Sequence, residues 1–505
     1  MNEKINKIEL LTPHEMKLAD KLAVNYENID SFELMQRAGM CVYNFIMQNY
    51  AHINSVAVLC GVGNNGGDAY IVAEILRQSG YQVICYALSA PKNGSDAEKA
   101  FKNWGGITKD INEILNDEYE LLIDGLLGAG IDRLLSTSLQ ELIKKINFQQ
   151  KTVISIDLPS GICGQTGAIL GEAIKATHTI TFFRYKLGHW LYPGRQLCGN
   201  HVLGEIGIRE NIIQSVNPSV NVNVPKLWLN KWPKVNTFAH KYSKGHVGVF
   251  SGPAVMTGAG RLAAKAAQRV GAGAVTLLSS KEAFSINAQH LTSIMLHLIK
   301  NKQDISNLIN ERKIRSVVLG PGFGDLDKAL QYAQLLIKKT KLLGLVLDAD
   351  ALSAFQDKIK ILSTLGNHGK IPIVITPHEG EFSKLFPDMA QNTKLTRIDK
   401  AKHAAKFLNV VVVYKGADTI IASPGGQIAI NINGTSLLAT AGSGDVLSGL
   451  IAGLIVQKMP AFEASCASVW LHAACAQQFG LGLIAEDLPE ILPKVLTKLL
   501  SDKTC

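Results

Sequence analysis

A short segment near the C-terminus combines a glycine turn with a carboxylate. Gly442, Ser443 and Gly444 stand directly before Asp445, and an apolar helix rich in small side chains is expected over residues 446 to 456. Backbone N–H groups at a glycine turn that opens a helix bind anions, assisted by the helix dipole. Asp445 would repel an anion, so it is suited to moving a proton beside a bound phosphate. A turn merely capped by Asp is the alternative for so short a motif.

A second glycine-rich segment follows the strand expected at Val56 to Cys60. Gly61, Gly63 and Gly66 have the spacing of a dinucleotide-binding turn. However, the next strand ends in Tyr86 to Ser89, which offers no acidic side chain for a ribose hydroxyl, and this argues against an ordinary NAD dehydrogenase. Asn64 to Asp68 instead supply two amides, two glycines and a carboxylate, as an anion site beside a cation site would need.

Two further carboxylates, Asp124 and Asp157, end expected strands in the same half of the chain. A lone Asp at a strand end is usually a turn cap. Ligands of open α/β sheets gather at the carboxyl ends of the strands, however. Three polar strand ends in one sheet therefore favour a site.

Length and composition set the general class of protein. The 505 residues are too many for one core, and 47% apolar with 18% charged residues describe a globular protein of two or three domains. The net charge of +9 is dispersed, which favours small anionic ligands over nucleic acid. The eight cysteines are scattered without zinc spacing, and neither an apolar signal core nor a membrane-spanning run occurs. We therefore expect a cytoplasmic protein with reduced thiols and no membrane partner.

Both halves are expected to be α/β, each with its own strands and glycine loops. The stretch 207–234 reads as a loop and holds the expected boundary, which gives domains 1–225 and 226–505. Helices of the first half are expected near 12 and 31 and over 70–78, with strands over 82–88 and 177–183. In the second half the expected strands are 247–251, 275–278, 316–319, 345–347, 373–375, 410–414, 419–422 and 427–431, and the expected helices are 257–270, 446–456 and 461–478, the last closing the chain.

The first half resembles the YjeF N-terminal domain, the NAD(P)H-hydrate epimerase family, from about Thr12 to Arg209. The shared features, in family order, are Leu34 to Gly39, the Asn-Asn-Gly-Gly-Asp segment, the strand end at Asp124, Asp157-Leu158-Pro159-Ser160-Gly161, and Lys186-x-Gly188. Ala69 and Gln36 depart from the family pattern. The resemblance implies a Rossmann-like three-layer fold.

The same resemblance implies the residues of an epimerase site. Potassium would be bound by Asn65, Asp124 and Ser160, which offer only hard oxygen ligands. Asp157 and Lys186 would handle the acid–base chemistry, with Asp157 also holding substrate. The remaining substrate-binding residues would be Asn64, Asn65, Gly66, Gly67, Asp68, Gly128, Ala129, Gly130, Ile131, Asp132, Arg133 and Leu134.

The second half resembles the YjeF C-terminal domain, a ribokinase-like NAD(P)H-hydrate dehydratase, from about His240 to Gln478. The shared features are His240-Lys241 with Gly245-His246, Gly258-Ala259, Gly320 to Gly324, Leu347 to Leu352, Thr376 to Glu381, and Lys415 to Thr419. Ser353 stands where the family usually has Asn.

The second resemblance implies a nucleotide site and a hydrate pocket. Lys415, Gly416, Ala417, Asp418, Thr419 and Gly444 would bind ADP with its magnesium, and Ala259, Gly324, His378 and Asp445 would line the pocket. Asp445 would be the catalytic residue. Like the kinase aspartate, it would help to phosphorylate the hydrate's hydroxyl, which is then expelled.

Together the two resemblances imply a bifunctional enzyme that repairs NADHX and NADPHX, the hydrates of NADH and NADPH. It would interconvert their R and S forms and dehydrate the S form at the expense of ADP, and it is expected to be a homo-oligomer. The choice between ADP and ATP stays open from the residues. The alternative is a ribokinase-superfamily small-molecule kinase fused to a non-catalytic interaction domain, although the N-terminal carboxylates and Lys186 argue against it.

Overall fold

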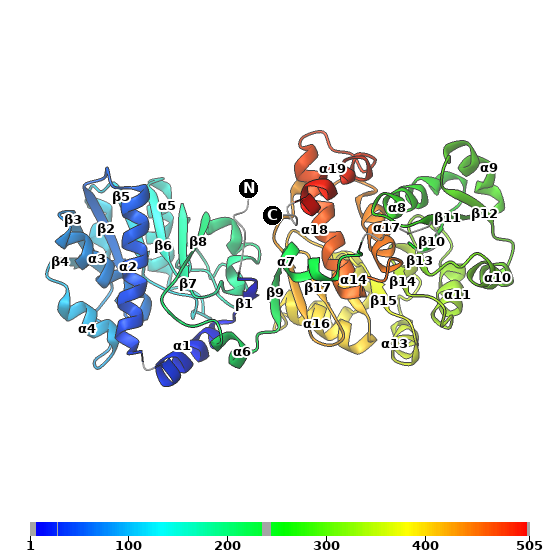
Figure 1. Ribbon diagram of the computed structural model, residues 1–505. Coiled ribbons are helices and arrows are strands. Elements are labelled where there is room, and N and C mark those ends of the chain that lie inside the picture. Colours follow the sequence, from blue (N-terminus) through cyan, green and yellow to red (C-terminus); the bar gives the residue numbers. More distant parts are fainter. Residues whose placement is uncertain (1–6, 28, 235–243, 502–505) are drawn as a thin grey trace. The chain divides into compact units, whose positions relative to one another are not determined.

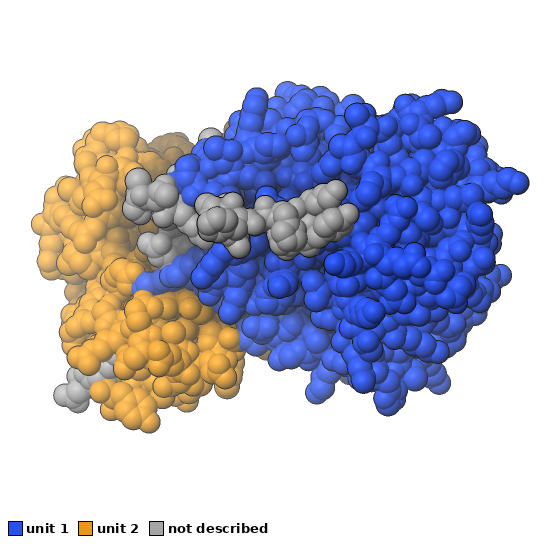
Figure 2. All heavy atoms as spheres, turned by 45° about the vertical axis from the view of Figure 1, so that its right-hand side comes forward, with its two compact units in different colours: residues 1–8, 219–505 blue, residues 9–218 orange. Residues whose placement is uncertain are grey.

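The computed structural model describes residues 7–27, 29–234 and 244–501. The chain divides into two compact units, which Figure 2 colours separately. In chain order, residues 9–218 are the first unit, orange and labelled unit 2 in the figure, and residues 1–8 with 219–505 are the second unit, blue and labelled unit 1. The motif residues His240 and Lys241 lie outside the described residues. No helix in the described part of the chain is both long and apolar enough to cross a bilayer.

The unit formed by residues 9–218 is built on a seven-stranded parallel sheet in the order β4-β3-β2-β5-β6-β7-β8. The strands of this sheet are β2 (Ser55–Cys60), β3 (Gln82–Ala87), β4 (Ile107–Asp110), β5 (Leu121–Gly125), β6 (Thr152–Ile156), β7 (His178–Phe182) and β8 (Asn200–Gly204). The two-residue strand β1 (Glu9–Leu10) lies outside it. The helices of the unit are α1 (Pro13–Glu27), α2 (Ser31–Asn49), α3 (Asn64–Gln78), α4 (Asp96–Asn103), α5 (Thr137–Phe148) and α6 (Ile212–Val216), with 3-10 turns η1 (Ile111–Asn116), η2 (Leu187–His189) and η3 (Gly194–Leu197).

The central strand β2 shows why this unit has three layers. Its side chains alternate between the two faces of the sheet. Val56 and Val58 pack into the cluster that contains α2 and α3, whereas Ala57 and Leu59 pack into the cluster that contains α5. A strand apolar on both faces must be covered on both, as in other parallel sheets. The Rossmann-like three-layer expectation is therefore confirmed (Figure 1).

The second unit holds a sheet with the order β9-β18-β17-β16-β15-β14-β13-β10-β11-β12. Its strands are β9 (Val220–Asn223), β10 (His246–Phe250), β11 (Ala274–Ser279), β12 (Met295–Leu298), β13 (Ser316–Leu319), β14 (Gly344–Leu347), β15 (Ile373–Ile375), β16 (Val411–Tyr414), β17 (Ile420–Ala422) and β18 (Ile428–Asn431). Neighbouring strands are parallel except in the β16-β17-β18 meander, which is antiparallel.

Helices cover both faces of this sheet. They are α7 (Pro225–Trp228), α8 (Thr257–Arg269), α9 (Lys281–His290), α10 (Lys302–Glu311), α11 (Leu326–Ile337), α12 (Asp350–Ser353), α13 (Ile359–His368), α14 (Glu379–Leu385), α15 (Pro387–Gln391), α16 (Arg397–Leu408), α17 (Ser443–Ile455), α18 (Ala461–Phe479) and α19 (Asp487–Ser501), with 3-10 turns η4 (Leu229–Lys231), η5 (Ala254–Met256) and η6 (Ser436–Leu438). One apolar cluster joins α8, α17, α18 and α19 to one face. In Figure 1, α11, α13 and α16 lie on the other side of the strands.

The helices α8 and α17 approach each other unusually closely because small residues line their contact. A Cβ atom added at Gly449 of α17 would stand 2.1 Å from the carbonyl oxygen of Ala263 in α8. At Gly453 the nearest atom of α8 or its cap would be 2.4 Å away, on Val270. The two helices therefore touch backbone to backbone, and any side chain at these glycines would push them apart.

Several element boundaries differ from those expected. Helix α3 begins at Asn64, not near 70, so the amide segment forms its first turn. Helix α17 likewise begins at Ser443 and includes Asp445. Helix α19 follows the helix that was expected to close the chain. The expected loop 207–234 contains α6, β9 and α7, and β9 pairs with β18, so the compact units divide between Pro218 and Ser219 instead of at 225/226.

A fragment of residues 9–218 should fold alone, because its sheet and both helix layers are complete without the rest of the chain. We expect it to be soluble and to unfold in one cooperative denaturant transition, measured by circular dichroism. An insoluble fragment, or one without a cooperative transition, would show that the unit depends on the remaining residues.

Candidate active sites

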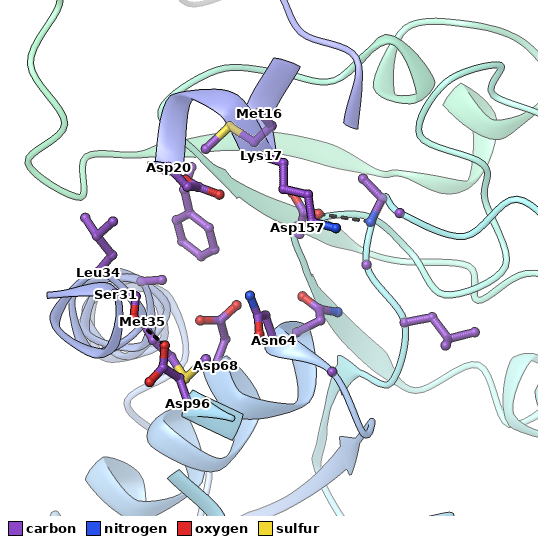
Figure 3. Close-up of a pocket in the computed structure, with 18 of the residues that line it drawn as sticks. Met16, Lys17, Asp20, Ser31, Leu34, Met35, Asn64, Asp68, Asp96 and Asp157 are labelled. Carbon is purple, nitrogen blue, oxygen red and sulfur yellow. Dashed lines mark hydrogen bonds between the residues drawn. The ribbon is translucent and has the colours of Figure 1, made fainter. Parts of the chain in front are cut away.

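The first unit contains a cavity of about 630 Å³ at the carboxyl ends of its strands. Helix α1 contributes Asp20, the start of α3 contributes Asn64 and Asp68, and the segment after β6 contributes Asp157 (Figure 3). Of the residues predicted for this site, those that line the cavity are Asn64, Asn65, Asp68, Gly128, Ala129, Gly130, Ile131, Asp157 and Lys186. Gly66, Gly67, Asp132, Arg133 and Leu134 are not among its lining residues.

The glycines of the α3 turn explain part of this difference. A Cβ atom at Gly66 would stand 1.8 Å from the carbonyl oxygen of Gly61, and one at Gly67 would stand 2.6 Å from the Met35 side chain. These glycines let α3 pack against its surroundings, and the neighbouring Asn64 and Asp68 face the cavity.

Asp157 and Lys186 form the strongest charged contact of the cavity. Lys186 Nζ lies 2.7 Å from Asp157 Oδ1, and the lysine is only 3% exposed. Asp157 also accepts hydrogen bonds from the Ala129 amide and the Thr181 hydroxyl. Burial alone would raise the pKa of Asp157, but the charge and hydrogen bond of Lys186 outweigh it and lower the pKa to about 2. Asp157 is therefore ionised at neutral pH.

Asp20 and Asp68 show the opposite behaviour. Burial raises the pKa of Asp20 to about 6, with Lys186 opposing and Asp157 adding to the shift. Burial, followed by repulsion from Asp157 and Asp20, holds the pKa of Asp68 well above its usual range. The cavity thus combines a permanently ionised carboxylate with carboxyls able to carry protons, which suits acid–base chemistry. Asp20 was not predicted from the sequence, because no motif in its helix distinguishes it from an ordinary surface aspartate.

Asp124 is completely buried beside this cavity. Its oxygens accept hydrogen bonds from the Ser160 amide at 2.9 Å, the Ser160 hydroxyl at 2.5 Å and the Ser155 hydroxyl at 2.8 Å. In the described ranges no lysine or arginine forms an ion pair with it. Burial raises its pKa despite these hydrogen bonds. A buried carboxyl satisfied only by neutral groups is one that a cation could balance.

Asn65 is the third residue predicted to bind a cation. Both polar atoms of its side chain are buried without a hydrogen-bond partner. The side-chain Cβ and Cγ of Asn65 pack against Gly128. The main-chain carbonyl oxygen of Asn65 packs against Gly125, the residue after Asp124. An unsatisfied buried amide is rare in proteins and calls for a ligand, water or ion. The donor set around Asn65, Asp124 and Ser160 therefore fits a hard cation.

A second charged pair lies at the carboxyl ends of the second sheet. Lys415, after β16, places its Nζ 3.0 Å from Oδ1 of Asp348, which follows β14 and is 2% exposed. The other Asp348 oxygen accepts a 2.6 Å hydrogen bond from Ser448 of α17. A Cβ atom at Gly444 would stand 3.5 Å from Lys415 Nζ, which brings the predicted lysine and glycine together. Asp348 belongs to the shared segment Leu347 to Leu352, but no role in the site was predicted for it.

Asp445 stands in the first turn of α17, beside this pair. Burial raises its pKa to about 7, repulsion from Asp348 adds to the shift, and Lys415 partly offsets it. Gly442, which caps the helix with φ 88°, lies next to Asp445. A carboxyl titrating near neutral pH is suited to accepting or donating a proton during turnover.

The other residues predicted to line the hydrate pocket are His378, Gly324 and Ala259, and each contacts other residues of the predicted motifs. His378 Nδ1 accepts hydrogen bonds from the Gly380 and Glu381 amides and so caps α14. Glu381 in turn lies 3.8 Å from Lys415 Nζ. The Gly324 amide donates to Asp350 at 2.8 Å. Ala259 packs against Gly322 in the same glycine turn.

The predicted nucleotide loop is held by local contacts. Thr419 Oγ1 accepts from the Gly416 amide at 3.1 Å, and Asp418, 2% exposed, pairs with Arg397 at 3.3 Å. Arg397 also donates to the Lys415 carbonyl and lies over the Tyr414 ring. Arg397 therefore stabilises the loop that carries Lys415, a role that no motif around it indicates.

Comparison with known proteins covers both units. Residues 31–188 match the YjeF-related protein N-terminus family, and residues 247–497 match the NAD(P)H-hydrate dehydratase family. The bifunctional NAD(P)H-hydrate repair enzyme Nnr of Moorella thermoacetica is 31% identical over 97% of both chains. This chain belongs to the bifunctional NAD(P)H-hydrate repair enzyme family. The family expected from the sequence is thereby confirmed.

Other members and one solved structure are also similar to this repair-enzyme chain. The Nnr enzyme of Escherichia coli K12 is 30% identical over 97% of this chain and 96% of its own. The ADP/ATP-dependent NAD(P)H-hydrate dehydratase of Bacillus subtilis, co-crystallised with ATP and Mg²⁺, is 25% identical, covers 55% of this chain and 98% of its own, and gives a TM-score of 0.48.

Lys186→Met should destabilise the unit that holds Asp157, by about 3–5 kcal/mol at pH 7, because it leaves a buried carboxylate unpaired. The pKa of Asp157, now depressed to about 2, should rise above its unfolded value near 3.8. The wild-type pair stabilises the fold above pH 3.8 and loses its effect as the pH falls towards 2. Above pH 3.8 the wild-type contribution is constant, so the deficit of the variant should shrink on acidification because its own unpaired Asp157 takes up a proton, measured by denaturant unfolding between pH 7 and pH 4. A pH-independent deficit would contradict the ion pair.

Proposed function

We propose that this chain interconverts the R and S hydrates of NADH and NADPH in its first unit and dehydrates the S hydrate in its second, at the expense of ADP. The observation that carries this proposal is the presence of two separate proton-handling sites on one family member: the Asp157–Lys186 pair and Asp445 beside Lys415 and Asp348. The kinase fused to a non-catalytic module, the alternative, is not favoured, because the match to bifunctional repair enzymes spans both units.

In the first unit, epimerisation needs proton transfer at the hydrated nicotinamide ring and no covalent nucleophile. Lys186 and Asp157 lie on one wall of the cavity, where they can orient and exchange a proton with the hydrate's hydroxyl-bearing centre. Asp68 and Asp20, whose pKa values are raised, are placed to donate protons from the α1 and α3 side. The α3 amides and the Gly128–Ile131 segment would hold the phosphates and ribose.

In the second unit, the hydrate's hydroxyl would attack the terminal phosphorus of the nucleotide while Asp445 takes its proton. The nucleotide loses that phosphoryl group, so ADP becomes AMP. The carbon–oxygen bond then breaks, phosphate leaves, and a ring proton is lost to restore the double bond. Lys415 would neutralise phosphate charge, and the Gly442–Gly444 turn would offer backbone amides to it.

Two ions would assist these reactions. Potassium would be held by Asn65, Asp124 and Ser160, since a single direct carboxylate balances a monovalent ion better than a divalent one. Magnesium would accompany the nucleotide. No group of three His, Cys, Asp or Glu side chains among the described residues could hold a metal by itself, so the phosphates would supply part of its coordination.

Location and oligomeric state complete the proposal. The seven described cysteines, Cys41, Cys60, Cys85, Cys163, Cys198, Cys466 and Cys475, are all free thiols, which supports the cytoplasm as the location. Homo-oligomerisation stays a proposal from the family resemblance.

Asp445→Asn should reduce ADP-dependent dehydration by about 10²–10⁴-fold, the range typical of a lost general acid–base group. The wild-type rate should rise with pH through about 7, because the ionised carboxylate is the proton acceptor. Recovery of nicotinamide absorbance from purified S hydrate measures both effects. Epimerisation, carried out in the other unit, serves as the control and should be unchanged. Near wild-type dehydration would remove Asp445 from the reaction.

Asp124→Ala should slow epimerisation and abolish its stimulation by potassium, while ADP-dependent dehydration of S hydrate stays intact. The physical reason is the loss of the buried carboxylate that we propose balances the cation together with Asn65. Rates measured by chromatographic separation of the R and S forms, with and without potassium, give the comparison. Stimulation of the wild type by magnesium but not potassium would show that the ion was misassigned.

A further inference from the structure

His189 touches the backbone of both residues of the Asp157–Lys186 pair. It ends η2 and is fully buried. Its Nε2 lies 2.7 Å from the carbonyl oxygen of Asp157, and its Nδ1 lies 3.0 Å from the amide nitrogen of Lys186. One imidazole ring thus bridges two segments that are far apart in the sequence. His189 is not among the residues that line the cavity, so it acts on the pair from behind.

The two hydrogen bonds fix the protonation state of the ring. A carbonyl oxygen only accepts, so the proton must be on Nε2. Nδ1 has two neighbours on Lys186, the amide nitrogen at 3.0 Å and the carbonyl oxygen at 3.2 Å. The closer one, the amide, only donates, so Nδ1 presents its lone pair to it and donates nothing to the carbonyl oxygen. Burial lowers the pKa of His189 to about 4, and the Lys186 charge adds to this effect. The ring is therefore neutral throughout the physiological range, in a single tautomer.

The backbone of Asp157 needs such a restraint. Its φ is 64°, in the left-handed region that non-glycine residues seldom adopt. This conformation turns the carboxylate to Lys186 Nζ, the Ala129 amide and the Thr181 hydroxyl. Conformations of this kind are unfavourable and persist only when surrounding contacts hold them. The His189 bond to the Asp157 carbonyl is such a contact.

We propose that His189 is a positioning residue for epimerisation, which sets the relative placement of Asp157 and Lys186 through their main chains. The inference rests on the proposed epimerase activity of this unit. Pre-organisation of a proton-transfer pair matters because small displacements of the reacting groups reduce the rate steeply. An apolar side chain could fill the same space but could bind neither main-chain group.

The ring is itself held by aromatic neighbours, which provide a matched control. Tyr185 meets His189 edge-on at 5.6 Å, and His201 meets it at 5.7 Å. His201 stacks on Trp190 and its Nε2 lies 3.2 Å from the His189 carbonyl oxygen. Within the described part of the chain, no hydrogen bond or ring contact joins the His201 side chain to Asp157 or Lys186. Replacing it perturbs the same buried cluster without removing the bridge.

The test compares three variants of the full-length protein. His189→Leu should lower kcat for epimerisation by about 10- to 100-fold, corresponding to two lost hydrogen bonds at roughly 1 kcal/mol each or somewhat more, with KM little changed. His189→Gln, whose amide offers one donor and one acceptor, should recover much of the loss. His201→Leu should stay near the wild-type rate. Equal losses in the Leu variants, or no rescue by Gln, would overturn the positioning role.

A measurement independent of activity separates this inference from the proposed function. Hydrogen exchange should show the Lys186 amide protected in the wild type and in His201→Leu, exposed in His189→Leu and partly protected in His189→Gln. Histidine ¹⁵N chemical shifts should show His189 as the neutral Nε2–H tautomer from pH 5 to 8. If both hold and the wild type epimerises no hydrate, the proposed function fails while the bridge stands. A titrating or Nδ1–H ring would refute the bridge.

Discussion

Each site depends on an ammonium group buried against a carboxylate at the carboxyl end of a parallel sheet. Lys186 pairs with Asp157 at 2.7 Å in one unit, and Lys415 pairs with Asp348 at 3.0 Å in the other. Removing two charges from water costs several kcal/mol per ion, and only close pairing with further hydrogen bonds offsets this cost. The serine, threonine and backbone donors around Asp157 and Asp348 supply those bonds. The sheets therefore have to deliver these partners to within bonding distance.

The pairs also determine how the neighbouring carboxyls behave. Asp157, directly paired, has its pKa lowered to about 2, whereas Asp20 has its pKa raised to about 6 by burial within the same cavity. In the second unit Asp348 has a lowered pKa through Lys415 and Ser448, and the adjacent Asp445 has its pKa raised to about 7. One ionised carboxylate next to one protonatable carboxyl is an arrangement that separates a fixed charge from a mobile proton. The two units use it independently, on different sheets.

The sequence was sufficient to predict candidate site residues where they belong to a short motif of consecutive residues at the end of a strand or the start of a helix. Asp124, Asp157 and Asp445 could be singled out because each ends a strand or opens a helix beside glycines. It was insufficient where a contact depends on tertiary packing. Asp20 comes from a helix whose pattern reads as ordinary, and His189 is one imidazole among thirteen in the chain until the fold brings it to Asp157.

The predicted boundaries of several helices and strands were wrong for related physical reasons. Val220–Asn223 looked like part of a polar linker because its strand character appears only when β18 pairs with it. Helix α19 carries Pro489 near its start and Pro493 within it, which disguises a helical pattern. The early starts of α3 and α17 were not expected because glycines have poor helix propensity. A Cβ atom at Gly66 of α3 would meet the Gly61 carbonyl oxygen at 1.8 Å, and Gly442 before α17 has a φ of 88°, which favours glycine.

The close packing of α8 against α17 links these observations to the second site. Ala259 stands in the first turn of α8 and Asp445 in the first turn of α17. Because glycines let the two helices touch backbone to backbone, the spacing between their first turns is set by rigid helix contact and not by a loop. Sites built on packed elements hold their geometry more precisely than sites on loops. The small residues that weaken α17 as a helix are thus what place the carboxyl of Asp445.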